Sequence, residues 1–471
     1  MRLIEALEQL KKEHLVSFHM PGHKNGRLLF SDNRDLLAYD ITEIPGADHL
    51  HDAEGCILET EMALTRFYGS ERTRMLVGGS TVGILSAIMG ATDRGDLILI
   101  NRNAHKSVYN AIEMHGLSPV YLYPQMEDYL GIPLGFDASE LKERLDGVKC
   151  ALFTYPTYEG VCYDLEPMIR MCHEKGIPVI VDEAHGAHLL LHKKGPKSAL
   201  LIGADVVIQS FHKTMPAMTQ TACLHFSEEG ILTDHQRDRI DWYLKSLQSS
   251  SPSYVLMASI DNMLTIAMNR GVSESERLEQ RIEAFHKFVK PLKNVNTDSF
   301  PLMDVTKIIL SVPKERFHLG VWDGDIISKR LREDYGIQSE YATKTMVLLM
   351  ASFLNTNEDF DQLEKALLDL DARMDLMLKE LQPVVTITHY DRVFKKIASM
   401  DTFVVPAHTA VNAALKTVTL HESVGEVSGS YVIPYPPGIP VLVPGERIIE
   451  ETLALVPEDV THLKVIIENK D

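Results

Sequence analysis

The sequence predicts an α/β fold in which helices cover a mainly parallel sheet. Between about residues 55 and 275, short apolar runs alternate with segments of helical periodicity. The apolar runs are nearly continuous, as is typical of strands buried on both faces of a parallel sheet. They are Leu97–Ile100, Pro119–Tyr123, Cys150–Thr154, Pro178–Val181 and Asp205–Ile208. Helices are expected between them over 81–91, 104–115, 137–145 and 165–174, and this order predicts a doubly wound sheet.

The rest of the chain is expected to form further units. An amphipathic helix is predicted over 1–16, and the polar segment 18–26 after it is predicted to be a loop. Beyond 275 the pattern changes to a charged helix, a strand and two more helices, expected at 275–295, Val305–Val312, 324–334 and 357–381. We place the domains at 1–40 (N-terminal helix and arm), 41–275 (large domain), 276–380 (small α/β domain) and 381–471 (C-terminal domain).

Composition and charge exclude several classes of protein. The chain has 471 residues, of which 45% are hydrophobic and 24% charged, as is usual for a globular protein and unlike a disordered one. Its net charge of −19 argues against nucleic-acid binding, which depends on contacts to phosphates. No apolar run approaches the length of a membrane-spanning helix, and no signal peptide is recognisable. Because the five cysteines are odd in number and form no CxxC pair, we expect a reduced, cytoplasmic location.

A lysine follows one of the predicted strands. Ser210, His212 and Lys213 come directly after the apolar run Asp205–Ile208. In open α/β sheets, ligands bind outside the carboxyl ends of the strands. A lysine there can attack a carbonyl group as a neutral amine. Taken alone, the segment is more typical of a surface lysine that follows a strand.

The preceding strand ends in a carboxylate. Asp182 follows the apolar run Pro178–Val181 and is followed by Ala184 and His185. A buried carboxylate costs free energy unless it has a cationic partner, and a protonated pyridine nitrogen would be one. An imine-forming lysine and a carboxylate that keeps the ring nitrogen protonated are the pair that pyridoxal 5′-phosphate (PLP) chemistry requires.

Two further segments fit this cofactor. Gly78, Gly79, Ser80 and Thr81 precede a helical segment, where backbone N–H groups and hydroxyls bind phosphate well. Any capped helix start has a similar sequence. His105 follows the run Leu97–Ile100 and is a candidate to lie flat on an aromatic cofactor, although a single histidine is more often structural.

Together these segments resemble the Orn/Lys/Arg decarboxylase family of fold-type-I PLP enzymes, over nearly the whole chain. The motifs that carry the resemblance are FHMPGHKNG (18–26), DITEIPGADHLHDAEG (40–55), GGST (78–81), NRNAHKSVYNAI (101–112), TYPTYEG (154–160), VDEAHGAH (181–188), SFHK (210–213) and VIPYPPGIPVLVPGE (432–446). The resemblance implies an aspartate-aminotransferase-like large domain with a mainly parallel sheet, a smaller α/β domain and a C-terminal α+β domain. It also implies dimers, or multiples of dimers, with active sites at the interface.

The resemblance also implies residue roles. Lys213 would carry PLP as an imine, Asp182 would pair with the pyridine nitrogen, and Lys213 or His212 would return a proton to the substrate. The other residues expected at the cofactor are His105 and Ala184 on its two faces, His185 bonded to Asp182, the phosphate-binding Ser80, Thr81, Ser210 and His212, and Ser250 reaching from a neighbouring subunit. The implied reaction converts a basic amino acid to CO2 and an amine for polyamine metabolism, with arginine slightly favoured over lysine and ornithine.

Some alternatives stay open at this point. Glu426 and Ser430 depart from the family's pattern, and Glu426 is a candidate to bind the distal cation of the substrate. Another fold-type-I reaction, such as that of an aminotransferase or an aldolase, would use the same lysine, and a non-catalytic relative would retain the fold. No metal site is expected, although Asp48, His49, His51, Asp52, His185 and His188 include metal-ligating residue types.

Overall fold

The computed structural model describes residues 16–18, 42–43, 47–317, 322–377, 390–400, 402–434, 438–457 and 459–467. Residues 1–15 of the predicted N-terminal helix lie outside the described residues, and Val16 belongs to a short strand, β1 (Val16–Ser17). Residues 19–26 of the first N-terminal motif, residues 40, 41 and 44–46 of the second, and Tyr435–Pro437 of the proline-rich turn also lie outside the described residues. No helix in the described part of the chain is both long and apolar enough to cross a membrane.

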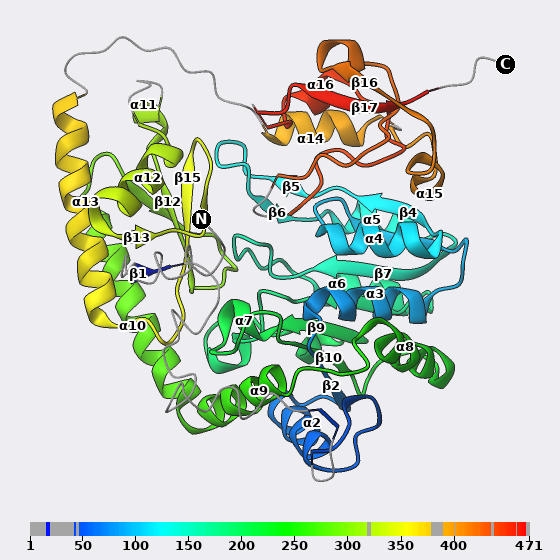
Figure 1. Ribbon diagram of the computed structural model, residues 1–471. Helices are drawn as coiled ribbons and strands as arrows, with labels where there is room; N and C mark the ends of the chain where they lie inside the picture. The colour runs from blue at the N-terminus through cyan, green and yellow to red at the C-terminus, as the bar shows by residue number, and fades with distance from the viewer. Residues whose placement is uncertain are drawn as a thin grey trace.

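A seven-stranded, mainly parallel sheet forms the centre of the molecule (Figure 1). Its strands, in spatial order, are β2 (Arg72–Leu76), β10 (Ala222–Phe226), β9 (Val206–Ser210), β8 (Val179–Asp182), β7 (Val148–Thr154), β3 (Leu97–Asn101) and β4 (Ser118–Leu122). β10 runs antiparallel to both of its neighbours, whereas the pairs from β9 to β4 are parallel. The five strands predicted from the sequence are confirmed, and β2 and β10 were not predicted.

Helices cover both faces of this sheet, as the apolar character of its strands predicts. On one face, Leu99 and Val181 pack in a cluster with α5 (Ala138–Arg144) and α6 (Glu166–His173). On the other face, Ile100 and Ile180 pack in a second cluster with α3 (Gly79–Ala91), α4 (Lys106–His115) and α8 (Asp234–Leu247). Because successive side chains of a strand point to opposite faces, one strand contributes to both clusters. The predicted doubly wound arrangement is therefore present.

A second, four-stranded sheet follows in the chain. Its spatial order is β11 (Asn296–Asp298), β12 (Lys307–Ser311), β15 (Met346–Met350) and β14 (Tyr341–Ala342), and β1 pairs separately with β13 (Ile337–Gln338). Its helices are α10 (Val272–Val289), α11 (Lys314–Phe317), α12 (Gly324–Tyr335) and α13 (Asn357–Met377). Figure 1 shows α13 along the outer side of this part, opposite the large sheet. A π-helical turn, Ala267–Gly271, joins α9 (Tyr254–Ile266) to α10, so the domain boundary predicted at 275 falls inside α10.

The C-terminal part lies against the β4 side of the large sheet (Figure 1). It contains α14 (Tyr390–Ala398), α15 (Ala407–Ala410), β16 (Leu415–Thr419), α16 (Glu450–Leu453) and β17 (His462–Ile466), and β16 pairs with β17. The other elements are α2 (Cys56–Tyr68), α7 (Phe211–Thr214), the hairpin β5 (Gln125–Met126) and β6 (Pro133–Gly135), and the short 3-10 helices Leu50–Asp52, Leu189–Leu191, Ala199–Ile202 and His421–Ser423. The domain boundaries predicted from the sequence stay predictions.

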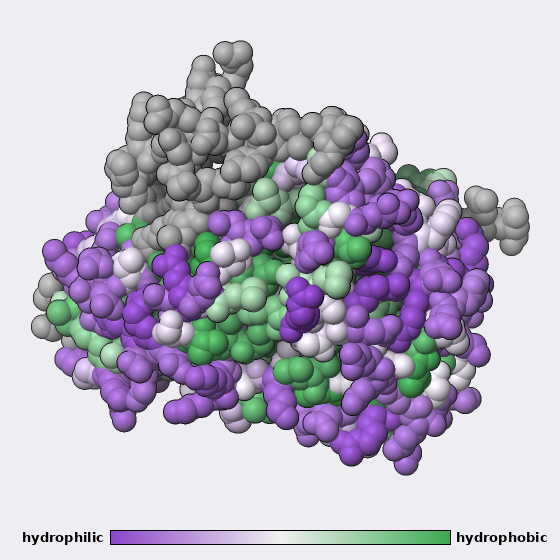
Figure 2. Space-filling view, turned by 90° about the horizontal axis from the view of Figure 1, so that it is seen from below, coloured by the Kyte–Doolittle hydropathy of each residue, from purple (hydrophilic) through white to green (hydrophobic). Residues whose placement is uncertain are grey.

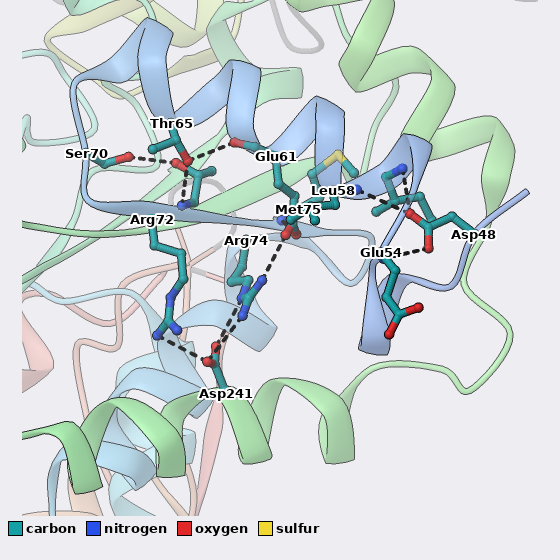
Figure 3. A network of polar contacts seen from close by, with 12 residues as sticks. Asp48, Glu54, Leu58, Glu61, Thr65, Ser70, Arg72, Arg74, Met75 and Asp241 are labelled. Carbon is teal, nitrogen blue, oxygen red and sulfur yellow. Dashed lines mark hydrogen bonds and ion pairs between the residues drawn. The ribbon is translucent and has the colours of Figure 1, made fainter.

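A network of ion pairs and hydrogen bonds joins α2 to the edge of the large sheet (Figure 3). Glu61 of α2 accepts from Arg74 Nη1 at 3.0 Å and from the Met75 amide at 2.9 Å. Arg74 and Arg72, both of β2, contact Asp241 of α8 at 3.2 and 3.1 Å. Both arginines of β2 are therefore neutralised by helices on either side of the strand.

Asp48 holds the start of α2 (Figure 3). Its carboxylate accepts from the amides of Glu54, Gly55 and Ile57 at 2.8 to 3.0 Å. Burial raises the pKa of Asp48, but the backbone N–H donors outweigh it and lower that pKa to about 2. The carboxylate therefore serves the backbone of this loop.

A buried ion pair fixes the C-terminal part to the large sheet. Arg102, directly after β3, donates to Glu446 from Nε at 3.2 Å and from Nη2 at 3.0 Å. The two side chains are only 6% and 5% exposed, and Arg102 Nη1 also donates to the Pro440 carbonyl at 2.7 Å. Burying two charges costs free energy, which only such complete pairing offsets. The loss of either partner is therefore expected to lower the free energy of unfolding strongly.

We therefore expect Glu446→Gln to lower the free energy of unfolding by about 3 kcal/mol, because it leaves the Arg102 charge buried and unneutralised. The measurement is urea unfolding of the purified protein. Glu426→Gln is the matched control, because it removes an ion pair with Lys416 whose side chains are 32% and 45% exposed. Such a surface pair contributes less than about 1 kcal/mol. Equal losses in the two variants would contradict a role for Glu446 in fixing the C-terminal part.

Candidate functional site

The carboxyl ends of four neighbouring strands bring predicted site residues, and Tyr158 with them, to one edge of the large sheet. β3, β7, β8 and β9 are parallel, so the segments that follow them all leave at this edge. These segments carry His105, Tyr158, Asp182 with His185, and Lys213, respectively. α3, which follows β2, starts at the same edge with Ser80 and Thr81 in its first turn.

Lys213 lies in the single helical turn that follows β9. Its Nζ donates to His185 Nε2 at 3.1 Å. Burial lowers the pKa of the Lys213 amine, against the attraction of Asp182, and the positive charge of Lys307 lowers it further. The residue is nevertheless partly exposed, so another molecule can reach it. Lys213 therefore has a microenvironment that favours a neutral, nucleophilic amine.

Asp182 is the last residue of β8 and is buried, with 3% of its surface exposed. The Ala184 amide donates to its Oδ1 at 3.2 Å. Burial raises the pKa of this carboxyl group, and the positive charge of Lys213 opposes that rise. Asp182 is thus a buried acid that a cation in the same site would stabilise in its ionised form.

Two histidines lie around Lys213. Burial, followed by the charge of Lys213, lowers the pKa of His105 to about 3 and the pKa of His185 well below its usual value. His105 caps α4, and its Nδ1 accepts from the Ser107 amide at 3.3 Å, so the ring is neutral with its proton on Nε2. The predicted bond between His185 and Asp182 is wrong, because His185 Nε2 pairs with Lys213 instead.

The predicted phosphate-binding residues are only partly brought together. Ser210 ends β9, and its buried Oγ has no hydrogen-bond partner within the described residues. His212 directs Nδ1 to the Thr221 carbonyl at 3.0 Å. Ser80 and Thr81 lie at the start of α3, which packs against β9. Ser250 is exposed in the turn after α8, where the His51 ring contacts the neighbouring Ser249 carbonyl at 2.7 Å, and within the described residues no hydrogen bond joins Ser250 to the other site residues.

The buried groups fit a ligand that carries both a cation and an anion. Asp182 needs a cationic partner, Lys213 offers an amine, and the unpartnered Ser210 hydroxyl offers a donor. PLP has a protonated pyridine nitrogen, an aldehyde and a phosphate, which match these three groups. In the described ranges, no group of three or more His, Cys, Asp or Glu side chains is placed to hold a metal ion.

Glu183, next to Asp182, has a structural role. It accepts from Ser198 Oγ at 2.8 Å and from the Ala199 amide and Gln209 Nε2, both at 2.6 Å. Burial raises its pKa to about 7, against these donors. Its partners explain why two consecutive acids can both be buried at the end of one strand.

Three residues near Lys213 were not predicted to belong to the site. Tyr158 places its ring 4.5 Å from the His185 ring and donates from its hydroxyl to Glu340. Lys307 of β12 is wholly buried and lies 3.4 Å from Asp304. The charges of Glu340 and Lys307 act on the pKa of Lys213 in opposite directions. Glu340 and Lys307 come from the second sheet, far along the chain, and no local pattern marks them.

Comparison with known proteins identifies the family. The family model described as "Orn/Lys/Arg decarboxylase, major domain" matches residues 2–322, and its C-terminal domain model matches residues 388–458. The chain belongs to the Orn/Lys/Arg decarboxylase family. It is 35% identical to the uncharacterized protein YaaO of Bacillus subtilis, over 96% of this chain and 92% of that protein. It is 31% identical to an arginine decarboxylase of Halalkalibacterium halodurans, over 95% of this chain and 91% of that protein.

Solved structures establish the fold of this family member. The constitutive lysine decarboxylase of E. coli superposes with a TM-score of 0.75 at 19% identity, over 98% of this chain and 81% of that one. A structure of SPT with PLP superposes with a TM-score of 0.56 at 16% identity, over 77% of this chain and 88% of that one. The predicted fold, that of the fold-type-I PLP enzymes with a mainly parallel sheet, is therefore confirmed.

Proposed function

We propose that the protein is a PLP-dependent carboxy-lyase that converts a basic L-amino acid to CO2 and the corresponding amine. Family membership supports decarboxylation of an amino acid. The observation that carries the proposal is the contact of Lys213 with His185 beside the buried acid Asp182, at the carboxyl edge of the sheet. When bound, PLP supplies an aldehyde for an amine and an electron sink for the bond to the substrate carboxylate.

The residues of this edge have distinct tasks in the proposal. Lys213 carries the cofactor, and Asp182 accepts a hydrogen bond from the pyridine nitrogen and keeps it protonated. His105 and Ala184 cover the two faces of the ring. Holding the scissile bond perpendicular to the ring selects decarboxylation over transamination, so the rigidity of these neighbours matters.

Proton transfer and phosphate binding involve the remaining predicted residues. Lys213 or His212 returns the proton to the substrate after CO2 leaves, since both follow β9 at the carboxyl edge. The phosphate is held by the start of α3 with Ser80 and Thr81, and by Ser210 and His212. Ser250 acts from the neighbouring subunit, which agrees with its exposure in this chain.

The substrate we propose first is arginine, followed by lysine and ornithine. Relatives of about 30% identity carry the name arginine decarboxylase, whereas the named lysine decarboxylases are 23% identical or less. The amine product would enter polyamine metabolism. All five cysteines are free, which supports the reduced environment of the cytoplasm.

A dimer is part of the proposal. Figure 2 shows the face of the molecule seen from below, where α2, α8 and α9 lie in Figure 1, and hydrophobic side chains gather in its middle. Exposed hydrophobic residues of this part of the chain include Met62, Trp242 and Met268, which are 45%, 60% and 63% exposed. Apolar patches of this kind mark interaction surfaces. If a second copy of the chain bound to this face, Ser250 would also lie near the neighbouring subunit.

The test is one incubation of the purified protein with PLP and equimolar arginine, lysine and ornithine. We expect agmatine, cadaverine or putrescine by mass spectrometry, with agmatine first. If the protein binds PLP through Lys213 but forms no amine, the proposed reaction is wrong, and an oxo-acid or aldehyde product would indicate an aminotransferase or an aldolase.

A further inference from the structure

Glu340 places a carboxylate beside Tyr158, whose ring contacts His185, the partner of Lys213. It lies between β13 and β14, and its amide donates to the Leu348 carbonyl of β15 at 2.9 Å, which fixes its backbone. Its side chain is half-buried and accepts a hydrogen bond from the Tyr158 hydroxyl. Burial lowers the pKa of Lys213, and the negative charge of Glu340, like that of Asp182, opposes this lowering.

Tyr158 and Tyr341 hold this carboxylate in a reciprocal arrangement. Tyr158 donates to Glu340, while Tyr341, the next residue, donates back to Glu159 at 2.7 Å. The two tyrosine rings lie 5.5 Å apart, and the Tyr158 ring also contacts His185. The segments 158–159 and 340–341 are therefore locked together, so the position of Glu340 relative to Lys213 is fixed by paired contacts.

A cavity adjoins Glu340 on the side of the C-terminal part. It has a volume of 830 Å3 and is lined by Glu340, Tyr341, the segment Ser430–Pro434 and residues near β17. This volume is ample for a small amino acid. Glu340 thus lines a space that a ligand can occupy and also contacts Tyr158, whose ring lies against His185.

Four other candidate acids are already engaged. Asp182 is the partner of the cofactor in the proposed function, and Glu183 accepts three hydrogen bonds. Asp304 is paired with His188 at 3.0 Å and with Lys307. Glu426, the candidate from the sequence, forms a partly exposed pair with Lys416 instead.

We propose that Glu340 binds the distal cation of the substrate and so determines the preference for basic amino acids. The inference rests on the proposed function, since ornithine, lysine and arginine share an α-amine and a distal cation. Desolvating that cation is favourable only beside a carboxylate. A carboxylate has about four acceptor positions, so Glu340 can accept from the substrate while it holds the Tyr158 hydroxyl. Tyr158 is then a positioning residue.

The first experiment compares Glu340→Gln, Tyr158→Phe and Glu426→Gln with the parent holoenzyme. KM and kcat are measured for arginine and for citrulline, its neutral isostere. We expect Glu340→Gln to raise KM for arginine about 10- to 100-fold, because it removes one charge-assisted contact, and to change kcat/KM for citrulline less than about twofold. Tyr158→Phe should raise KM for arginine less than about threefold, and Glu426→Gln should leave both substrates unchanged.

Other outcomes overturn the assignment. If Glu340→Gln lowered kcat/KM equally for arginine and for citrulline, Glu340 would have only a structural role. The same conclusion would follow if Tyr158→Phe lowered kcat/KM as much as Glu340→Gln does. An unchanged KM for arginine would exclude contact with the cation. If lysine or ornithine is the better substrate, that amino acid and its neutral analogue replace the pair.

A second measurement separates failure of this assignment from failure of the proposed reaction. Agmatine is titrated into the PLP-loaded parent and Glu340→Gln proteins in a calorimeter, which needs no turnover. Weaker binding to the variant by about tenfold or more supports the assignment even if the parent forms no amine. A parent that decarboxylates arginine while both proteins bind agmatine equally overturns the role of Glu340 and leaves the reaction intact.

Discussion

Lys213→Ala is expected to abolish decarboxylation and to remove the visible absorbance of protein-bound PLP. The variant loses the only amine that the described structure places between Asp182, His105 and His185, so the cofactor has no attachment and the substrate no proton donor at that position. We expect kcat to fall by more than about 10⁴-fold. Absorbance spectra with added PLP and the amine assay measure the two effects separately.

The control for this variant is Lys193→Ala, which removes an exposed lysine paired with Glu276 on the surface. It should retain both the spectrum and the rate. A Lys213→Ala protein that still binds PLP covalently would mean that another amine carries the cofactor, such as that of the buried Lys307, whose charge acts on Lys213.

Asp182→Asn is expected to lower kcat by about 10²- to 10⁴-fold while PLP remains attached to Lys213. The amide cannot stabilise a positive charge on the pyridine nitrogen, so the electron sink is weakened although the shape of the site is retained. Single-turnover kinetics measures the rate, and absorbance confirms that the cofactor is present.

The neighbouring acid provides the matched control. Glu183→Gln disturbs three hydrogen bonds within the loop and should lower Tm, with a smaller effect on the chemical step. If Asp182→Asn lowered Tm as much as Glu183→Gln and left kcat unchanged, Asp182 would be a structural acid and not the partner of the pyridine nitrogen.

The local part of the site could be predicted because its residues directly follow buried strands. Asp182 and Lys213 stand at the ends of apolar runs that form β8 and β9, and this placement alone brings them to one edge. β2 and β10 escaped prediction for a physical reason. In β2, Arg72 and Arg74 give the segment a polar sequence, although in the structure Asp241 and Glu61 neutralise their charges. In β10, His225 interrupts the apolar run, although in the structure it forms a buried hydrogen bond with Thr73.

The contributions from distant segments could not be predicted. Glu340 and Lys307 reach the neighbourhood of Lys213 only because the second sheet packs beside the large one, and no periodicity reports that packing. The predicted hydrogen bond between His185 and Asp182 was wrong for a related reason. Sequence order placed His185 next to Asp182, but the turn after β8 directs its ring to Lys213 and against Tyr158.

The anchoring of the C-terminal part has a consequence for how the protein is made. Arg102 is held by Glu446 and the Pro440 carbonyl, and the Lys106 amide donates to the Gly438 carbonyl at 3.1 Å. These two attachments lie on either side of His105. A nascent chain still short of residue 438 would already contain Asp182 and Lys213, yet the loop that presents His105 would lack both supports. The candidate site is therefore completed only after the C-terminal part has been made, and a truncated product would retain Lys213 without the supported loop that carries His105.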